Sequence, residues 1–444
     1  MIKSEKYAIY IAGITSACAY FMLAHFIERT TFFSLLAYFS ICFAGYYFLR
    51  NISFKVALTF GIAFRILFFV AIPALSQDFY RFIWDGRLLA LGGNPFLDTP
   101  NQILSQTHIY DAHFLVAKMG DLSANNFSNY PPLNQAIFGI TAWLSRDSLL
   151  LNVILFRIII ILADVGNFFF LRKILSYLKK PTHFANLYFL NPLVIVELTG
   201  NLHFEGVMMF FFALALYLLI CKKYYSLSAL MMACSILIKL LPLLLLPFIL
   251  RKIGFKASIK YYSLCILISI LSFAFFYDPL LIQHYTKTVG LWFGKFEFNA
   301  SIYYLFREVG FWITGYNIIG ILGKLLPVSV LAFMGYLSLK KGETQNPQFI
   351  TYMLISLSAY FFVSTTVHPW YLITLLFLNV FVNFRYIWIW SYTVILSYFA
   401  YSNPDFKESP WLLFIEYLPV YYLFIQAIPQ YSLPFQTTFF LKKK

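Results

Sequence analysis

Residues 148–171 read SLLLNVILFRIIIILADVGNFFFL, an apolar run whose only charged residues are Arg157 and Asp164. A transmembrane helix needs about 20 such residues. Similar runs recur along the whole chain. We predict fourteen spans, at 7–25, 31–49, 54–75, 148–171, 184–200, 203–220, 225–238, 240–250, 258–276, 314–339, 349–367, 369–384, 386–401 and 411–428. The sequence therefore predicts an all-α polytopic membrane protein.

The composition agrees with this fold class. Hydrophobic residues make up 61% of the 444 residues and charged residues only 11%, whereas a soluble domain carries about 25% charged residues. A soluble fold, a disordered chain and a disulfide scaffold are thereby excluded. The five cysteines lie in or beside apolar runs and do not indicate a redox compartment. The first run lacks a cleavage site, so we expect a retained helix and not a signal peptide.

Two polar loops interrupt the spans, the first at 76–147 and the second at 277–313. In the first, 131–145 is predicted to form a helix in the membrane interface with Trp143 at the headgroups. The second contains a short amphipathic stretch near 299–309. We expect one integral membrane domain with five consecutive sections, at 1–75, 76–147, 148–276, 277–313 and 314–444. If residues 225–250 cross the membrane only once, the loops before or after this segment lie on the opposite side of the membrane from the one predicted.

The net charge of +15 comes from 33 basic and 18 acidic residues. With the N-terminus in the cytoplasm, most basic residues fall in short cytoplasmic loops, as membrane topology requires. Most acids then fall in the two polar loops on the outer side. The positive charge is thus predicted to anchor the protein, and nucleic acid is excluded as a partner.

Residues 76–87 read SQDFYRFIWDGR and are followed by GGNPF at 92–96. On a helix, Asp78, Arg81 and Asp85 would share one face. A carboxylate there could take a proton from a hydroxyl, and arginines could hold a phosphate. The alternative is a surface helix with a ladder of ion pairs, anchored by Trp84. Motifs typical of ATP, dinucleotide, serine-hydrolase and zinc sites are missing from the sequence.

This motif resembles the first outer loop of the GT-C superfamily of glycosyltransferases. The likeness is greatest to the bacterial mannosyltransferase-like branch, which uses polyprenyl-phosphate sugars. Further matching segments follow in the same order: YPPL at 130–133, NP at 191–192, GNLHFE at 200–205, IKLLP at 238–242 and VHPWY at 367–371.

The resemblance implies a GT-C-like bundle of about 12–14 transmembrane helices. It also implies an inverting transfer of one hexose, with mannose favoured, from a polyprenyl-phosphate sugar to a lipid-linked or extracytoplasmic glycan. Asp78 matches the general base of the family. Ser76 and Gln77 stand where the family often has another acid, so Asp85 is expected to orient Arg81 or an acceptor hydroxyl. The resemblance further implies a bacterial inner membrane, an active site on the periplasmic side and neither a cofactor nor a divalent metal.

The other predicted site residues bind substrate. Arg81, Arg87 and Lys239 are candidates for the leaving phosphate, and His203 and Glu205 for sugar hydroxyls. The full set of predicted substrate-binding residues is Arg81, Asp85, Arg87, Asn94, Tyr130, His203, Glu205, Lys239 and His368. Three structural alternatives remain open: helix capping by Glu205, snorkelling of Lys239 and interface anchoring by His368.

Other polar residues receive structural interpretations. Arg157 and Asp164 are predicted to pair within the membrane, and Glu197 needs a partner or a cavity there. His108, Asp111, His113 and Asp121 match no metal-binding spacing.

A lipid flippase or transporter and a non-catalytic assembly factor are the rival functions. For an enzyme, we expect Asp78 and His203 to face one cavity that opens both to lipid and to the outer water. We expect the polyprenyl tail to lie in an apolar groove between spans.

Overall fold

The computed structural model describes residues 3–339 and 346–428, and within these ranges the protein is built from helices. Six helical segments are long and apolar enough to cross a membrane. They are α1 (Lys3–His25), α2 (Phe32–Leu49), α8 (Leu149–Tyr177), α11 (Glu205–Tyr217) with its extension to Lys222, α14 (Phe255–Ala274) and α17 (Ile319–Leu339). The predicted fold class, an all-α polytopic membrane protein, is confirmed.

The other predicted spans are shorter or broken helices. They comprise α3 (Phe54–Ile66), α9 (Asn186–Phe189), α10 (Pro192–Val194), α12 (Tyr225–Ile238), α13 (Pro247–Ile253), α18 (Asn346–Val363), α19 (Leu372–Val382), α20 (Arg385–Thr393) and α21 (Pro410–Ala427). The third predicted span is too long, because α3 ends at Ile66 and turns follow. The segment 184–200 breaks before Pro192, since proline has no N–H and disfavours helical geometry in the residue before it. The number of membrane crossings stays a prediction.

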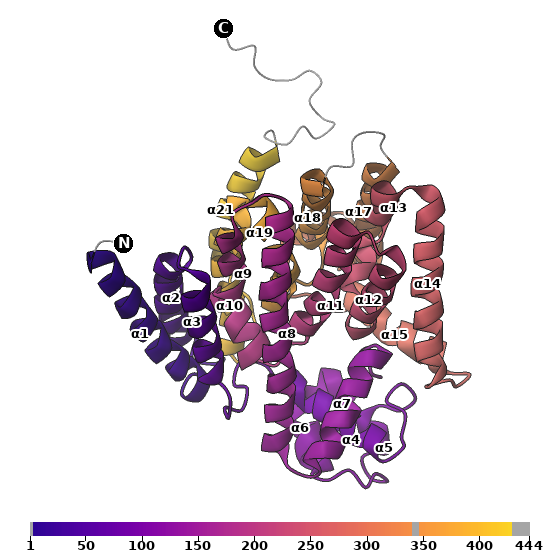
Figure 1. Ribbon diagram of the computed structural model, residues 1–444. Helices are drawn as coiled ribbons and strands as arrows, with labels where there is room; N and C mark the ends of the chain where they lie inside the picture. Colours follow the sequence, from indigo (N-terminus) through magenta and orange to yellow (C-terminus); the bar gives the residue numbers. More distant parts are fainter. Residues whose placement is uncertain (1–2, 340–345, 429–444) are drawn as a thin grey trace.

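The first polar loop folds into four helices, α4 (Asp78–Ala90), α5 (Pro100–Ile103), α6 (Ala112–Ala124) and α7 (Pro132–Ser145). They gather at one end of the bundle, beside the start of α8 (Figure 1). The helix predicted at 131–145 is therefore confirmed as α7, and Trp143 on it is 71% exposed.

Helix α4 is buried, so the alternative of a surface helix anchored by Trp84 is wrong. Trp84 is only 1% exposed. At Gly86 a Cβ atom would lie 2.3 Å from the carbonyl oxygen of Phe138 on α7. Any other residue at this position would push the two helices apart, so Gly86 allows α4 and α7 to touch backbone to backbone.

The second polar loop forms α15 (Leu281–Gly294) and α16 (Ile302–Thr314). The amphipathic stretch predicted near 299–309 corresponds to α16, which begins at Ile302. Between the two helices, Phe298 pairs with the segment after α18. Its N–H donates to Thr365 O at 3.0 Å, and its carbonyl accepts from the Val367 N–H at 2.8 Å. This bridge attaches the second polar loop to the VHPWY segment.

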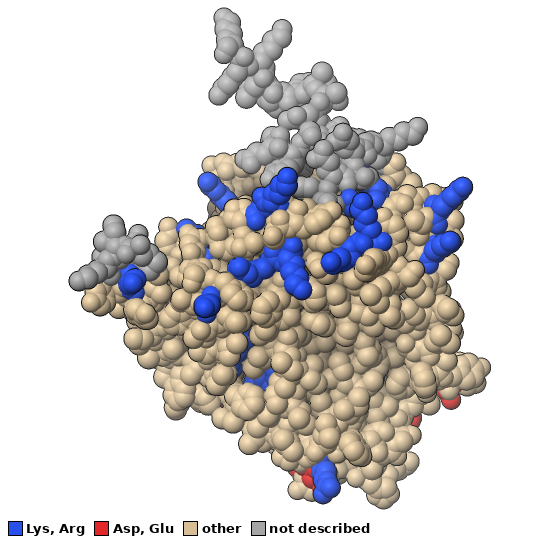
Figure 2. Space-filling model, in the orientation of Figure 1, with Lys and Arg blue, Asp and Glu red and all other residues tan. Residues whose placement is uncertain are grey.

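The basic residues lie mainly at one end of the molecule. Figure 2 shows Lys and Arg gathered at the end opposite α4–α7, while few appear around the first polar loop. The predicted separation of charge agrees with this view. Assignment of the basic end to the cytoplasm stays a prediction.

The intramembrane pair predicted between Arg157 and Asp164 is wrong. Arg65 on α3 forms the pair instead, with its Nε donating to Asp164 Oδ2 at 3.0 Å. Arg157 donates to backbone carbonyls, at 2.8 Å to Thr199 and 2.9 Å to Phe69. All three charged side chains are fully buried. The spacing of Arg157 and Asp164 correctly places them on one face of α8. The register of α3 against α8, however, makes Arg65 the partner of Asp164.

Candidate active site

Asp78 is the first residue of α4 and its carboxylate is partly accessible. The side chain is 33% exposed, and Oδ2 lies 3.7 Å from Nε2 of His203. The Asp78 N–H donates to the Ser76 hydroxyl at 3.3 Å. A carboxylate that keeps one side open while a buried cation holds the other can act on a substrate.

His203 lies in the turn between the π-helix Ile195–Gly200 and α11, where Leu202 has φ +62°. Its ring bridges two carboxylates, because Nδ1 is 3.2 Å from Glu197 Oε2 while Nε2 faces Asp78. Only 2% of the His203 side chain is exposed. The turn thus holds the imidazole in a fixed position between the bundle and the first polar loop.

Glu197 has the partners that its burial demands. Tyr398 donates its hydroxyl at 2.9 Å and Asn201 its amide at 3.0 Å, in addition to the contact with His203. The expectation that Glu197 needs a partner is confirmed. Asp78, His203 and Glu197 form a continuous chain of charged groups, which we call the Asp78–His203–Glu197 relay.

A row of aromatic rings packs against His203 of the relay. The centroids of His203 and Trp370 lie 3.9 Å apart, and those of Trp370 and His368 lie 4.3 Å apart with nearly parallel planes. His368 in turn packs on Phe298 at 4.9 Å. The VHPWY segment therefore links the second polar loop to His203. His368 is 6% exposed and contacts this stack, so its structural alternative, an interface anchor, is not supported.

Electrostatics set the protonation of this group. Burial raises the pKa of Asp78, but contact with His203 and the charges of His203 and Lys239 outweigh it, so this pKa is lower than usual. Burial lowers the pKa of His203, but contacts with Asp78 and Glu197 raise it to about 9. Burial also brings the pKa of His368 to about 3. At neutral pH Asp78 is an anion, His203 a cation and His368 neutral.

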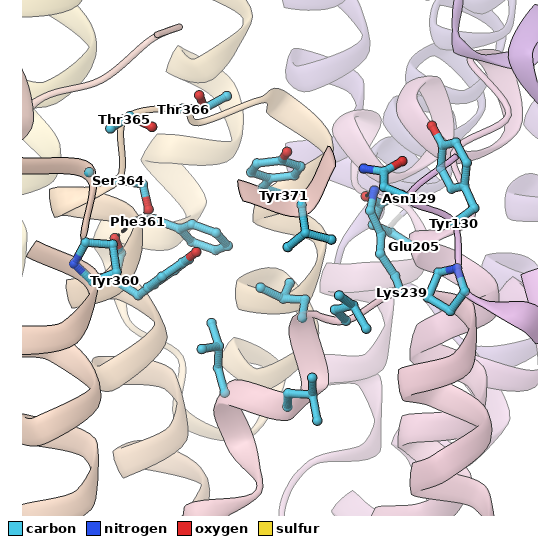
Figure 3. Close-up of a pocket in the computed structure, with 18 residues that line it drawn as sticks. Asn129, Tyr130, Glu205, Lys239, Tyr360, Phe361, Ser364, Thr365, Thr366 and Tyr371 are labelled. Atoms are coloured by element: carbon cyan, nitrogen blue, oxygen red, sulfur yellow. Dashed lines mark hydrogen bonds and ion pairs between the residues drawn. The ribbon is translucent and has the colours of Figure 1, made fainter. Parts of the chain in front are cut away.

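A cavity of about 340 Å³ lies beside the relay. Figure 3 shows Asn129, Tyr130, Glu205 and Lys239 on one wall and Ser364, Thr365 and Thr366 on the other. Apolar side chains line the rest: Leu240, Leu241, Leu243, Leu244, Val289, Pro327, Tyr360, Phe361 and Tyr371. The predicted apolar groove thus corresponds to a mainly apolar cavity with charged residues on one wall and hydroxyl groups on the other.

Asp78 and His203 do not line this cavity, contrary to our expectation. The residues that do line it are Tyr130, Glu205 and Lys239, three of the predicted substrate-binding residues. Asp78 is nevertheless close enough for an electrostatic interaction with Lys239. The relay ends next to the cavity rather than in it.

Lys239 follows the last residue of α12 and pairs with Glu205, the first residue of α11. Glu205 is 1% exposed, and its second oxygen has no partner among the described residues. Lys239 is 30% exposed, and its Nζ lies 5.6 Å from the Tyr371 ring centroid. Lys239 therefore points into the cavity as a paired cation and does not snorkel to the surface. Glu205 neutralises it instead of only capping α11.

The two loop arginines bind the protein itself. Arg81 is 4% exposed and donates to Asp85 at 2.7 Å and to the carbonyls of Ser123 and Asn126. Arg87 is 5% exposed and donates to the carbonyls of Tyr110 and Asp147. These bonds hold both guanidiniums in place, although the buried Arg87 Nε has no partner among the described residues. Their position does not support the predicted contact with the leaving phosphate.

Asp85 and Asn94 also have structural partners. Asp85 is fully buried and accepts from Ser128 at 2.6 Å and Gln135 at 2.9 Å, besides Arg81. It orients Arg81, which agrees with the prediction. The Asn94 amide donates to the Phe276 carbonyl at 3.1 Å and so ties the first polar loop to the end of α14.

Sequence reasoning missed the relay and the role of Trp370. The energetic cost of a charged Glu197 within the membrane indicated that it needs a partner. Nothing in the spacing of residues along the sequence connected Glu197 to Asp78. Within the described residues, no three His, Cys, Asp or Glu side chains lie close enough to hold a metal ion. His108, Asp111, His113 and Asp121 are all exposed.

Comparison with known proteins identifies the family. Residues 14–253 match the family model described as "MptA_B family: Alpha-(1->6)-mannopyranosyltransferase, N-terminal domain". Searches among curated proteins and solved structures gave no match. The matched region contains Asp78, His203, Glu205 and Lys239. The resemblance to a mannosyltransferase is therefore confirmed, and the match, which covers more than half of the chain, shows that this protein belongs to the MptA_B family of mannosyltransferases.

Proposed function

We propose that this protein transfers one mannose from a polyprenyl-phosphate donor to a hydroxyl of a lipid-linked or extracytoplasmic glycan, in a GT-C-type reaction. The family description suggests the 6-hydroxyl of an acceptor mannose. The observation that carries the proposal is the partly exposed Asp78 carboxylate, ionised by buried His203 and placed next to a cavity with a lysine. We place this site on the periplasmic side of a bacterial inner membrane.

Asp78 acts as the general base. The acceptor oxygen attacks the anomeric carbon of the donor as its proton passes to Asp78. The bond from that carbon to the phosphate oxygen breaks, and polyprenyl phosphate leaves with the bonding electrons. Attack opposite the leaving group inverts the anomeric configuration. Asp78 has a low pKa, so it takes the proton only as the hydroxyl becomes acidic in the transition state.

His203 keeps the base in its working form. Its positive charge, balanced on the other side by Glu197, stabilises the Asp78 carboxylate. Because His203 stacks on Trp370 and is almost fully buried, it cannot turn away from Asp78. His203 is therefore a positioning residue in this proposal.

The cavity receives the donor lipid. Its leucine-rich surface suits a polyprenyl chain, and Lys239 on the charged wall suits the phosphate. Glu205 fixes the lysine, but two further N–H groups of Lys239 remain for phosphate oxygens. Tyr130 and Asn129 lie on the same wall and can donate to sugar hydroxyls (Figure 3).

The test is a transfer assay with the purified protein in liposomes. Mannosyl, glucosyl and arabinosyl polyprenyl phosphates and a nucleotide-activated mannose are each offered with an α-mannoside acceptor that bears a free 6-hydroxyl. We expect product only with mannosyl polyprenyl phosphate, and none from folded Asp78→Asn protein. Use of the nucleotide sugar, or full activity of Asp78→Asn, would contradict the proposal.

The same liposomes test the rival transporter function. Sealed vesicles that carry a fluorescent polyprenyl-phosphate lipid in one leaflet report its movement to the other. We expect no acceleration by the protein. Rapid movement of the lipid without any sugar transfer would identify a flippase instead.

A further inference from the structure

A second, much smaller cavity lies behind the aromatic stack. It measures about 10 Å³ and is enclosed by the second polar loop, the 3-10 helix Val394–Ser402 and the start of α21. This space is enough for one water molecule or one small ion. Its polar lining residues are Asn299, Ser397, Glu408, Ser409 and Glu416.

Two of these residues have buried oxygens without a partner. Glu416 Oε2 and Asn299 Oδ1 belong to fully buried side chains and accept no hydrogen bond from any described residue. The other atoms of both groups are engaged. Glu416 Oε1 accepts from Asn299 Nδ2 at 3.1 Å and from Trp390 Nε1 at 2.9 Å. Since the amide nitrogen of Asn299 also donates to Val367 O, its orientation is fixed and its oxygen remains free.

The cavity also concentrates negative charge. Glu408 contributes a second carboxylate, whose oxygens accept from the Asn299 N–H and the Tyr304 hydroxyl. None of the described residues that line the cavity is basic. Glu416 is fully buried and Glu408 is partly buried. Two such carboxylates beside one cavity are costly unless a cation or protons compensate them.

We propose that this cavity is a structural Ca²⁺ site, with Glu416 Oε2, Asn299 Oδ1 and Glu408 as its principal ligands. All the polar groups available are oxygens, and a hard cation prefers such ligands. Two carboxylates balance a divalent charge. Mg²⁺ usually retains several waters, and a cavity of about 10 Å³ has no room for them. Ca²⁺ accepts protein oxygens in flexible geometry, and the Ser397 and Ser409 hydroxyls can complete its shell.

The position of this site gives the ion a role. Asn299 adopts the left-handed backbone conformation, with φ +50°, and the residue before it, Phe298, packs on His368. The stack then continues through Trp370 to His203. An ion bound to Asn299 would fix the near end of the aromatic stack whose far end holds the relay. It lies away from the reacting atoms and takes no part in the transfer.

The experiment measures ion binding without any substrate, so its result is independent of the proposed transferase function. Full-length protein in nanodiscs is washed with EGTA, and Ca²⁺ binding is measured by equilibrium dialysis with ⁴⁵Ca. Melting is followed by tryptophan fluorescence, to which Trp390 beside Glu416 contributes. We expect one bound Ca²⁺ per chain, a higher melting temperature on adding Ca²⁺ and little change with the same concentration of Mg²⁺.

Two variants and one control assign the ion to this cavity. Glu416→Gln keeps an oxygen for Trp390 and Asn299 but removes a charge, and Glu408→Gln does the same at the second carboxylate. Each is expected to weaken Ca²⁺ binding by at least about tenfold, because affinity follows the charge of the ligands. Glu308→Gln changes a carboxylate that is 55% exposed on α16 and should bind Ca²⁺ like the wild type.

Three results would overturn the proposal. The first is an absence of stoichiometric Ca²⁺ binding, which would mean that a proton or a water occupies the cavity. The second is wild-type affinity in both glutamine variants. The third is equal stabilisation by Mg²⁺ and Ca²⁺, which would exclude a site that selects the larger ion.

Discussion

The first residue and the middle of α4 carry the same kind of side chain in opposite surroundings. Asp78 at the first turn is one-third exposed and pairs with His203. Asp85, two turns later, is fully buried and accepts from Arg81, Ser128 and Gln135. A fully buried carboxylate whose two oxygens already accept three hydrogen bonds is closed to a substrate, whereas a partly open one can take its proton.

In the proposed mechanism, this contrast separates catalysis from support within one short motif. The WDGR part of the motif builds the first polar loop through Asp85, which holds Arg81, through Arg87 and through the close packing at Gly86. The aspartate at its start is left to face the bundle. Four predictions test the contrast.

The largest effect is expected for Asp78→Asn. The amide cannot accept the proton of the acceptor hydroxyl, so the transfer rate should fall by about 10²- to 10⁴-fold, the usual contribution of a general base. The melting temperature should fall less than in Asp85→Asn, because the Asp78 side chain is 33% exposed and only its contact with buried His203 is weakened. Initial rates with mannosyl polyprenyl phosphate and thermal unfolding of the same preparation measure both quantities.

Asp85→Asn should act on stability instead. Its replacement leaves the buried Arg81 without a charged partner, and breaking such a pair costs about 3–5 kcal/mol. We expect a lower melting temperature and faster proteolysis within residues 76–147, while the folded fraction keeps its activity. A stable but inactive Asp85→Asn protein would reverse the roles assigned to the two aspartates.

A pH titration sharpens the assignment of His203. Its folded pKa of about 9 exceeds the ordinary value of 6.5, so its charge contributes stability that is fully present below about pH 6.5. That contribution is lost as the pH rises through about 9. Melting temperature and transfer rate should therefore both decline over this range. In His203→Gln the alkaline decline of the melting temperature should be absent. An unchanged profile in this variant would assign the titration to another group.

The smallest effect is expected for Asn94→Ala, which removes the hydrogen bond to the Phe276 carbonyl and a local one that Asn94 Oδ1 accepts from the Phe96 N–H. A single hydrogen bond contributes about 1 kcal/mol. The melting temperature should decrease slightly, and the rate per folded molecule should not change. A loss of activity comparable to that of Asp78→Asn would show that Asn94 contacts substrate.

The features that the sequence predicted correctly are local. The helix that carries Asp78, Arg81 and Asp85, the helix at 131–145 and the break between two helical segments at Lys239 all follow from spacing or composition within one segment. The bond between Arg81 and Asp85 is also local, four residues apart on a helix.

The features that it could not predict depend on how segments meet. Arg65 displaced Arg157 as the partner of Asp164 because the register of α3 against α8 is set by packing. His203 reaches Asp78 because a π-helix and a left-handed residue at Leu202 turn the chain after Glu197. No periodic pattern in the sequence predicts that turn. Likewise, the pairing of Glu205 with Lys239 joins two helix ends that are 34 residues apart.

The backbone contact at Gly86 has a consequence for the interpretation of genomes. The most recognisable residues of the motif, WDGR at 84–87, determine how α4 packs on α7. They do so whether or not an acid stands at position 78. On the proposed mechanism, a homologous chain that retains WDGR but has lost the acid six residues before its tryptophan would fold alike and be inactive. Searches that separate enzymes from inactive paralogues in this family should therefore ask first for an acid at position 78 and only then for the WDGR motif.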